Sequence, residues 1–526
     1  MLDEFARRFK PEPTEELLGA VHALITKVFK QPVHSSDKIT KALMTTIERV
    51  CKKFFTPDPA ANNKKHLVFV QKYKRSFEKD FLPPPKGLTF PETLMQLIQR
   101  LKKWKYHLQY VVGSRSQTEL KLEKLSPYLV RLQSHEIEIP GQYIRSEDQE
   151  PNLDQNVILQ RFEPEVLVHH KNGFSHRRLT LRGNDGSLNH FLVQYSIAHI
   201  TRSDERMMQL YVLLNRMMSK FKETRKRNLV YHVPLVVPLT HRLRLMESHD
   251  AHVTLEEVYE ESCFARGTDP DQPLLYYRDM MRKVLDCEAN QAARLKTFND
   301  VCTHIVPDYL LSRYIHRSLP AQDQLWAFKK EFAAQLALHG FLSYVLKIGD
   351  RSLQKIAFFK QSGRMSNVEF YPAYGDQQAI ENHEQVPFRL TRNLTTFLNP
   401  FVVDGVFASV LSATNSCFFS NSEVLKNYLF LFIRDDLISW NATKMPYKTD
   451  ASQRSMEKAM REKISANVAQ IFRRLQGLNN QPPQPTADRN GRPAQQPPNH
   501  KINQLIETAT SKSKLASMNA TWSPWF

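Results

Sequence analysis

The stretch VLKIGDRSLQKI, residues 345–356, decides how this sequence is interpreted. It follows a long amphipathic pattern that predicts a helix, and Gly349, Asp350 and Arg351 then predict a tight loop. In such a loop, the Asp350 carboxylate could accept a proton from a reactant. It could equally pair with Arg351 and help to form the turn. The surrounding sequence has to decide between a chemical and a structural role.

Length and composition favour a folded protein of several domains. The 526 residues are enough for roughly two to four domains, and 41% of them are hydrophobic. The five cysteines form no CxxC pair, which argues against a disulfide framework or a zinc site and favours a reducing compartment. The first residues lack an apolar signal region, and the apolar run 428–433 is too short to span a bilayer. We therefore expect a soluble, intracellular protein without membrane contact.

The positive charge is concentrated near the start of the chain. The formal net charge is +19, and residues 1–130 hold 24 Lys and Arg against 13 Asp and Glu, a net +11. Such asymmetry favours contact with nucleic acid or with acidic proteins. A solvated face of a helical domain explains the same charge. Residues 50–130 are the candidate for a weak nucleic-acid contact.

The first quarter of the sequence predicts helices. Apolar residues recur at three- and four-residue steps over 17–28, the period of one helix face. The stretch LMQLIQRLKKWKYHLQYV, residues 94–111, repeats the pattern with lysines on the other side. Between them, DFLPPPKG at 80–87 predicts a break.

From about residue 135 the pattern changes to short strands. RRLTLRGNDGSLNHFLVQY, residues 177–195, predicts a hairpin that turns at Asn184-Asp185-Gly186. A helix should follow, with Ser203 as its cap and acidic residues in its first turn. Its expected buried stripe consists of Met207, Leu210, Tyr211, Leu214, Met218 and Phe221.

The second half predicts mostly helices with short connections, over residues 251–476. A Pro- and Gln-rich linker at 477–501 then precedes a last short helix from about Ile502. The chain ends in TWSPWF, which could enter a membrane interface but is expected to dock on the protein. The sequence therefore predicts an α+β protein with a small β-rich lobe and a large helical lobe. An α-helical bundle precedes these lobes, and a short helical element follows them.

Several motifs in this order resemble the phosphatidylinositol-kinase-related protein kinases. HEIEIPGQY (135–143) resembles the start of the small lobe, and SDERMMQLYVLLN (203–215) the helix behind the site. VPFRLT (386–391) resembles the end of the activation loop. The stretches at 326–346, 434–440 and the terminus resemble a pseudokinase member of the family most strongly.

The resemblance implies a bilobal kinase-like fold of the phosphatidylinositol-kinase type. It implies the following divisions: 1–130, end of the FAT helices and an FRB-like bundle; 131–246, small lobe; 247–476, large lobe; 477–501, linker; 502–526, FATC element.

The resemblance also points to the residues that would carry phosphoryl transfer. The small-lobe lysine that holds phosphates falls at Gln194, and the catalytic-loop histidine falls at Ser352. The metal-binding asparagine falls at Lys355, and the second metal-binding aspartate at Glu369. Phosphoryl transfer depends almost wholly on such electrostatic groups, so the resemblance implies a pseudokinase without cofactor or metal.

Two interpretations of these residues stay open. Asp350 matches its family position, but a general base cannot act on a phosphate that no lysine or metal has positioned. Lys355 could instead cradle a phosphate directly, as a point charge, and allow metal-free nucleotide binding.

The function implied by the resemblance is a nuclear scaffold. It would be a transcription co-activator subunit of histone acetyltransferase complexes of the SAGA and MYST types, linking activators to the acetyltransferase module. Members of this kind are far longer, so we expect the chain to be part of a longer protein. An active Ser/Thr protein kinase of the same family and a basic nucleic-acid-binding module are the alternatives.

Overall fold

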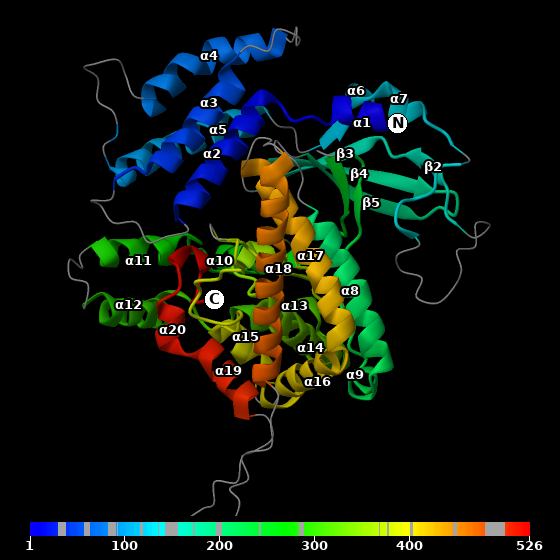
Figure 1. Ribbon diagram of the computed structural model, residues 1–526, viewed down its shortest axis with the longest axis vertical. Helices are drawn as coiled ribbons and strands as arrows, with labels where there is room; N and C mark the ends of the chain where they lie inside the picture. Colours follow the sequence, from blue (N-terminus) through cyan, green and yellow to red (C-terminus); the bar gives the residue numbers. More distant parts are fainter. Residues whose placement is uncertain are drawn as a thin grey trace, which may run out of the picture. The chain divides into compact units, whose positions relative to one another are not determined.

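The computed structural model describes residues 1–526 except those in the following ranges: 30–37, 57–63, 83–90, 92, 116–118, 135, 143–155, 172–173, 196–201, 241–242, 283–288, 368, 376–377, 400–402, 445–449 and 479–499. The helix break expected at 80–87 and the linker expected at 477–501 lie largely outside the described residues. Figure 1 shows the described elements coloured along the sequence.

The chain forms two compact units. The first consists of Met1–Ile200 and Val236–Ser248, and the second of Thr201–Leu235 and His249–Phe526. The segment 201–235 thus leaves the β-rich unit, packs in the helical unit, and is followed by a return to the sheet. Each unit has its own core, and each is described by itself below.

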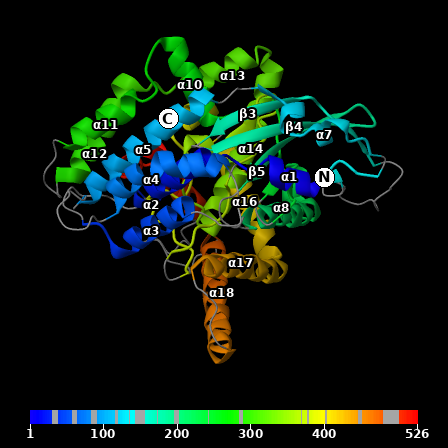
Figure 2. The same cartoon turned by 90° about the horizontal axis from the view of Figure 1, so that it is seen from above.

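The first unit begins with a bundle of amphipathic helices (Figure 2). Its core is aromatic: the ring of Trp104 contacts those of Phe77 and Phe81 at centroid distances of 5.1 and 6.2 Å. The Trp104 indole Nε1 donates a hydrogen bond of 2.7 Å to Asp80 Oδ2. The helices expected at 17–28 and 94–111 are confirmed. The bundle contains α2 (Pro13–Phe29), α3 (Lys41–Phe55), α4 (Lys64–Phe81) and α5 (Leu94–Arg115). Helix α1 (Leu2–Arg8) packs elsewhere in the unit, where the Phe5 ring lies 6.0 Å from that of Phe162 and Glu4 Oε1 accepts from the Ser126 hydroxyl.

The expectation of helices alone over 1–130 is wrong at one place. Glu119–Lys121 forms the strand β1, which pairs antiparallel with the strand β3 (Glu165–Lys171). Three residues carry too little local pattern to reveal a strand, because the partner that stabilises it lies more than forty residues later. The short helices α6 (Leu122–Leu125) and α7 (Pro127–Arg131) follow.

A sheet forms the rest of the first unit. Its strand order is β1-β3-β4-β5-β7-β6, and all neighbouring strands are antiparallel. Strand β4 pairs with β3 along its first half and with β2 along its second half. The expected hairpin is confirmed as β4 and β5. The turn closes because Gly186 has a φ of +83° and the Gly183 N–H donates to Ser187 O at 2.9 Å. The strands not yet placed are β2 (Leu159–Phe162), β4 (Phe174–Gly183), β5 (Leu188–Tyr195), β6 (Val236–Pro238) and β7 (Leu243–Glu247).

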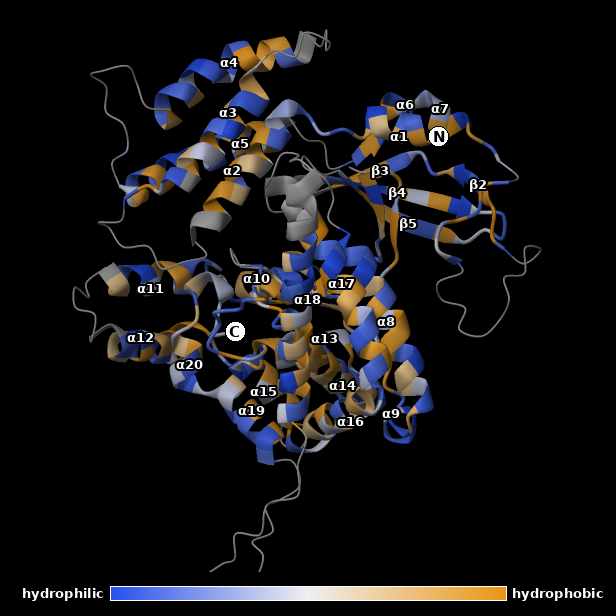
Figure 3. Cartoon of the chain, in the orientation of Figure 1, coloured by the Kyte–Doolittle hydropathy of each residue, from blue (hydrophilic) through white to orange (hydrophobic). Residues whose placement is uncertain are grey.

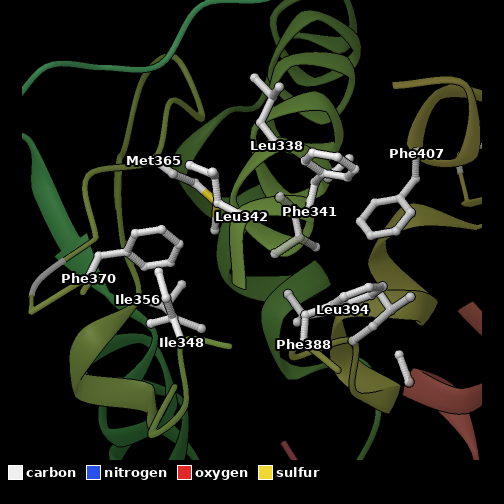
Figure 4. Close-up of a cluster of buried hydrophobic side chains, with 14 of the residues drawn as sticks. Leu338, Phe341, Leu342, Ile348, Ile356, Met365, Phe370, Phe388, Leu394 and Phe407 are labelled. Carbon is white, nitrogen blue, oxygen red and sulfur yellow. The ribbon is translucent and has the colours of Figure 1, made fainter. Parts of the chain in front are cut away.

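The second unit is mainly helical, and the long helix α14 (Gln322–Leu346) lies in its core. Phe332 and Phe341 on α14 are fully buried, and Figure 4 shows side chains from later segments gathered around the helix. In Figure 3 the ribbons of α14 and α16 (Ala408–Ser420) contain many hydrophobic residues. This burial explains the long apolar pattern that precedes the loop at 347–356.

The remaining elements of the second unit are α8 (Ser203–Lys220), α9 (Lys222–Lys226), β8 (His252–Thr254), α10 (Leu255–Arg266), α11 (Gln272–Arg282), α12 (Ala289–Asp300), η3 (Val301–Ile305), α13 (Leu310–Ser318), η4 (Leu353–Lys355), β9 (Ala357–Phe359), α15 (Arg392–Leu398), η5 (Val403–Phe407), α16 (Ala408–Ser420), α17 (Ser422–Lys444), α18 (Asp450–Leu478), α19 (His500–Thr510), α20 (Lys512–Ala516) and η6 (Ala520–Trp522).

Helix α8 confirms its predicted stripe but not its predicted cap. The stripe faces the core, with Phe221 partly buried. The cap position is Arg202, which makes no side-chain cap bond, and Ser203 is the first helical residue. The Ser203 hydroxyl instead donates to Asp436 Oδ1 on α17 at 2.9 Å. The Ser203 hydroxyl, which the local sequence predicted as a helix cap, therefore bonds to a residue that is distant in sequence.

The aromatic terminus docks on the helical unit, as expected. Trp522, Trp525 and Phe526 are buried, and the Phe526 ring lies 5.0 Å from that of Tyr259. Over the part of the chain that the structure describes, no single helix is long and apolar enough to cross a membrane. The bent pair Arg392–Leu398 and Val403–Ser420 meets that criterion by length and composition only.

A buried carboxyl links α8 to α17. Asp436 is 6% exposed and accepts hydrogen bonds from Ser203 and from the Tyr374 hydroxyl, the latter at 3.1 Å. Burial raises the pKa of Asp436 to about 6, although both hydrogen bonds oppose the shift. The unfolded chain keeps a pKa of about 3.9, so the folded state holds this proton more tightly between about pH 4 and 6.

We predict that Asp436→Asn stabilises the protein near neutral pH. The free energy of unfolding of the wild type should fall as pH rises through this window, because the folded protein must then bury a charge. The asparagine side chain would keep an acceptor oxygen without the charge. The variant should gain on the order of 1–3 kcal/mol at about pH 7.5 and nothing near pH 4. Thermal unfolding at the two pH values measures this. The exposed Asp404→Asn serves as control, and a variant less stable at both pH values would contradict the prediction.

Candidate functional site

The loop after α14 has the tight shape that its sequence predicts. Lys347 ends the helix with a φ of 51°, and Asp350 has a φ of 55°. A Cβ at Gly349 would lie 2.8 Å from Asn382 Oδ1, so a larger residue here would have to displace the Asn382 side chain. The Asp350 N–H donates to Glu384 Oε1 at 2.5 Å, while its own side chain is 63% exposed.

Lys355 lies between two carboxylates. Its Nζ is 2.5 Å from Asp350 Oδ2 and 2.9 Å from Glu369 Oε2. The lysine side chain is 18% exposed, less than the side chains of Asp350 (63%) and Glu369 (49%). Three of the five residues singled out from the sequence are thus brought together, although they span twenty positions. The Asp350 side chain pairs with Lys355, which the sequence alone did not suggest.

Ser352 orients Lys355 through the backbone. It directly precedes the single 3₁₀ turn η4, and its carbonyl oxygen accepts a hydrogen bond of 3.1 Å from the Lys355 N–H. This turn places the lysine five residues after Asp350 and within reach of it. Ser352 is partly buried and lies in the same loop as the other candidates.

Arg351 holds the second carboxylate in place. It is 3% exposed, its Nη2 donates to the Glu369 main-chain oxygen at 2.7 Å, and its guanidinium lies 5.2 Å from the Phe370 ring centroid. Glu369 itself has a φ of 49°. Burial lowers the pKa of Arg351, although neighbouring carboxylates oppose the shift. These contacts therefore hold the loop and residues 369–370 in fixed positions relative to each other.

Arg389 is a key residue that the sequence interpretation missed. Its Nε donates to Arg351 O at 2.9 Å and its Nη1 donates to Phe526 O at 2.8 Å. Its Nη2 donates to Trp522 O, and its guanidinium lies 3.7 Å from the Trp522 ring centroid. Burial lowers its pKa to about 9. A lone arginine in the apolar run VPFRLT was the signal that could have revealed it.

Gln194 belongs to the first unit, whereas the other four candidates belong to the second. It lies on β5 directly opposite Arg244 of β7, and its Oε1 accepts a hydrogen bond of 2.8 Å from Arg244 Nε. The amide at the position expected for a phosphate-binding lysine is therefore engaged by a cross-strand guanidinium.

The geometry limits what the loop can bind. A Mg²⁺ ion needs oxygen ligands at about 2.0–2.1 Å. Asp350 and Glu369 are the two carboxylates that contact Lys355, whereas Glu384 accepts from the Asp350 N–H. The Lys355 ammonium contacts both of them. A cation could use this pair only by displacing the ammonium and overcoming its repulsion.

We predict that Lys355→Asn creates divalent-cation binding. Asparagine removes the competing charge, adds an oxygen ligand, and leaves both carboxylates. Mn²⁺ titration followed by electron paramagnetic resonance should show at least about tenfold tighter binding than in the wild type, which corresponds to about 1.4 kcal/mol. The exposed Lys360→Asn is the matched control. Equal Mn²⁺ affinity in Lys355→Asn and wild type would contradict the interpretation that the ammonium occupies a cation site.

Known proteins resemble this chain over most of its length. Residues 191–442 match the family model "Phosphatidylinositol 3- and 4-kinase". The chain is 30% identical to the SAGA complex/NuA4 acetyltransferase complex subunit TRA1 of Saccharomyces cerevisiae, over 82% of this chain and 12% of that protein. It is 28% identical to the transformation/transcription domain-associated protein of Homo sapiens, over 86% of this chain and 12% of that protein. It is 26% identical to the DNA-dependent protein kinase catalytic subunit of Mus musculus, over 61% of this chain and 8% of that protein.

Solved structures show the same fold. The FAT and kinase domain of CtTel1 superposes with a TM-score of 0.59 at 16% identity, and the match covers 98% of this chain and 34% of that one. The predicted α+β, bilobal kinase fold is confirmed. The chain spans about 12% of the length of the first curated relatives that it matches. Residues 191–442 thus form a domain of the phosphatidylinositol 3- and 4-kinase type, and the chain as a whole is similar to TRA1 and to the transformation/transcription domain-associated protein.

Proposed function

We propose that this chain is a catalytically inactive, kinase-like scaffold in a nuclear transcription co-activator. Its partners would be subunits of histone acetyltransferase complexes of the SAGA and MYST types, together with transcription activators. Residues 50–130 would add a weak contact with nucleic acid. The chain would contribute a rigid surface, and other subunits would carry out the chemistry.

The observation that carries the inactive assignment is the position of Lys355. Its ammonium pairs with Asp350 and Glu369, the two carboxylates that a kinase-like site would use for base catalysis and metal binding. In the first unit, Gln194 is uncharged and its amide oxygen already accepts from Arg244. Gln194 therefore supplies no positive charge for a phosphate, and the Lys355 ammonium stands where a metal ion would have to bind.

The co-activator role rests on the relatives. Two of them, from Saccharomyces cerevisiae and Schizosaccharomyces pombe, are named as subunits of the SAGA complex and of the NuA4 acetyltransferase complex. We also propose that residues 1–130 are the end of the FAT helices and an FRB-like bundle, and that residues 502–526 are a FATC element. The docked terminus, with Trp525 and Phe526 buried, supports a FATC element that acts as part of the large lobe.

Nucleotide binding tests the inactive assignment. We expect the unfolding temperature of the chain to be the same with ATP and Mg²⁺, with ATP and EDTA, and without ATP. A ligand at a hundredfold excess over its Kd would add about 2.7 kcal/mol of stability, which a melting curve resolves easily. A shift that needs Mg²⁺ would revive the active-kinase alternative. A shift that persists in EDTA would mean that Lys355 cradles a phosphate.

Asp350→Ala tests the scaffold role directly. The variant removes the candidate base, so a scaffold should keep its partners. The tagged chain would be purified with its partners, and the acetyltransferase activity that accompanies it would be measured for variant and wild type. We expect equal activity, within about twofold. Arg389→Ala is the comparison, because loss of the docked terminus should reduce recovery of the complex. Kinase activity is assayed on the same preparations. Phosphate transfer that is present in the wild type and absent in Asp350→Ala would refute the proposal.

A further inference from the structure

Helix α5 presents an aromatic and cationic face to solvent. Lys103, Tyr106, His107 and Tyr110 are exposed and recur at three- and four-residue steps, so they share one face. Tyr106 is 69% exposed and Tyr110 is 76% exposed. The opposite face of α5 supplies the buried residues of the bundle, so the two tyrosines have no role in that core.

The neighbouring face of α4 extends this surface. Lys72, Arg75 and Lys79 are exposed at i, i+3 and i+7. The Lys72 ammonium lies 5.2 Å from the Tyr73 ring centroid, and the Tyr73 ring lies 6.2 Å from the His107 ring. These contacts join the cations of α4 to the stripe on α5. Both helices are drawn in blue in Figure 2.

The charge of this surface has one sign. Residues 94–115 contain five Lys and Arg and no Asp or Glu. On α4, Asp80 is partly buried and accepts from the Trp104 indole, and Glu78 is also partly buried. Among the described side chains of α4 and α5, none of the exposed ones is acidic. The surface therefore complements a polyanion.

The tyrosines decide which polyanion fits. Cations alone would suffice for the phosphates of a duplex, whose bases are stacked inside it. Exposed rings become useful when bases are free to stack on them. Tyr106 and Tyr110 lie about 6 Å apart along the helix axis, so each can take a different base. The exposed side chains of α5 that the structure describes include no aliphatic ones, whereas Leu67 and Val68 are exposed near the start of α4.

We propose that this surface, which we call the α4–α5 face (Lys72, Arg75, Lys79, Lys103, Tyr106, His107 and Tyr110), binds single-stranded nucleic acid. The cations contact phosphates, and the two tyrosines stack on bases. The inference rests on the nucleic-acid contact included in the proposed function, and it is independent of the pseudokinase assignment.

Fluorescence anisotropy with the full chain tests the inference. The probes are a labelled oligothymidylate and a duplex of the same length, each titrated over a series of salt concentrations. We expect the single strand to bind at least about tenfold more tightly than the duplex. The double variant Tyr106→Ala/Tyr110→Ala should lose at least about tenfold in single-strand affinity with an unchanged salt slope. Tyr106→Phe/Tyr110→Phe should bind like the wild type, because the rings remain.

Charge variants separate the two contributions. Lys72→Gln/Lys103→Gln should weaken binding to both probes. The salt slope for the single strand should fall by about 0.7 for each phosphate that the variant no longer neutralises. Tyr128→Ala on α7, where the ring is 51% exposed, is the matched control and should have no effect. Melting curves of each variant report whether the fold is intact.

Three outcomes would overturn the inference. Equal affinity for strand and duplex, with the tyrosine variants unaffected, would leave a general nucleic-acid contact without the single-strand preference. Binding of polyglutamate but of neither probe at physiological salt would identify a site for acidic proteins. Absence of all binding would also remove the nucleic-acid contact from the proposed function. In each case the acetyltransferase recovery experiment remains a separate test of the scaffold.

Discussion

The buried guanidinium of Arg389 organises the helical unit around the loop. A buried cation is tolerated only when its donors are satisfied, and carbonyl oxygens from two distant segments satisfy this one. One belongs to Arg351 in the loop after α14, and the others belong to Trp522 and Phe526 in the terminus. Stacking on the Trp522 ring adds a further contact. The loop, the 386–391 segment and the terminus therefore hold their positions together.

The candidate site depends on this arrangement. Arg351 is fixed at its carbonyl by Arg389 and, through its own guanidinium, holds the backbone of Glu369. That backbone contact helps to place the Glu369 carboxylate beside Lys355, which also contacts Asp350. In our proposal, a frame suited to positioning two carboxylates around a metal now positions them around an ammonium. A scaffold protein would retain this arrangement, because the buried arginines stabilise the fold whether or not the protein is catalytically active.

Local patterns predicted the local structure well. The turn at Asn184-Asp185-Gly186 and the stripe of α8 were found correctly, because a positive φ at glycine and a 3.6-residue period are properties of neighbouring residues. Predictions failed where a distant partner competed. The Ser203 hydroxyl bonds to Asp436 rather than capping its helix, and Glu119–Lys121 is a strand because β3 pairs with it.

The same distinction applies to the site. The sequence by itself determined which charges are present: a glutamine and a lysine stand at positions where the family resemblance expects a lysine and a metal-binding asparagine. It also determined the excess of cations in the first quarter. Only the tertiary structure decided that Lys355 contacts both Asp350 and Glu369, that Arg389 joins the loop to the terminus, and that Tyr106 and Tyr110 face solvent. The physical reason is that residue identity sets charge and local propensity, whereas pairing, burial and exposure depend on segments that meet only after the chain has folded.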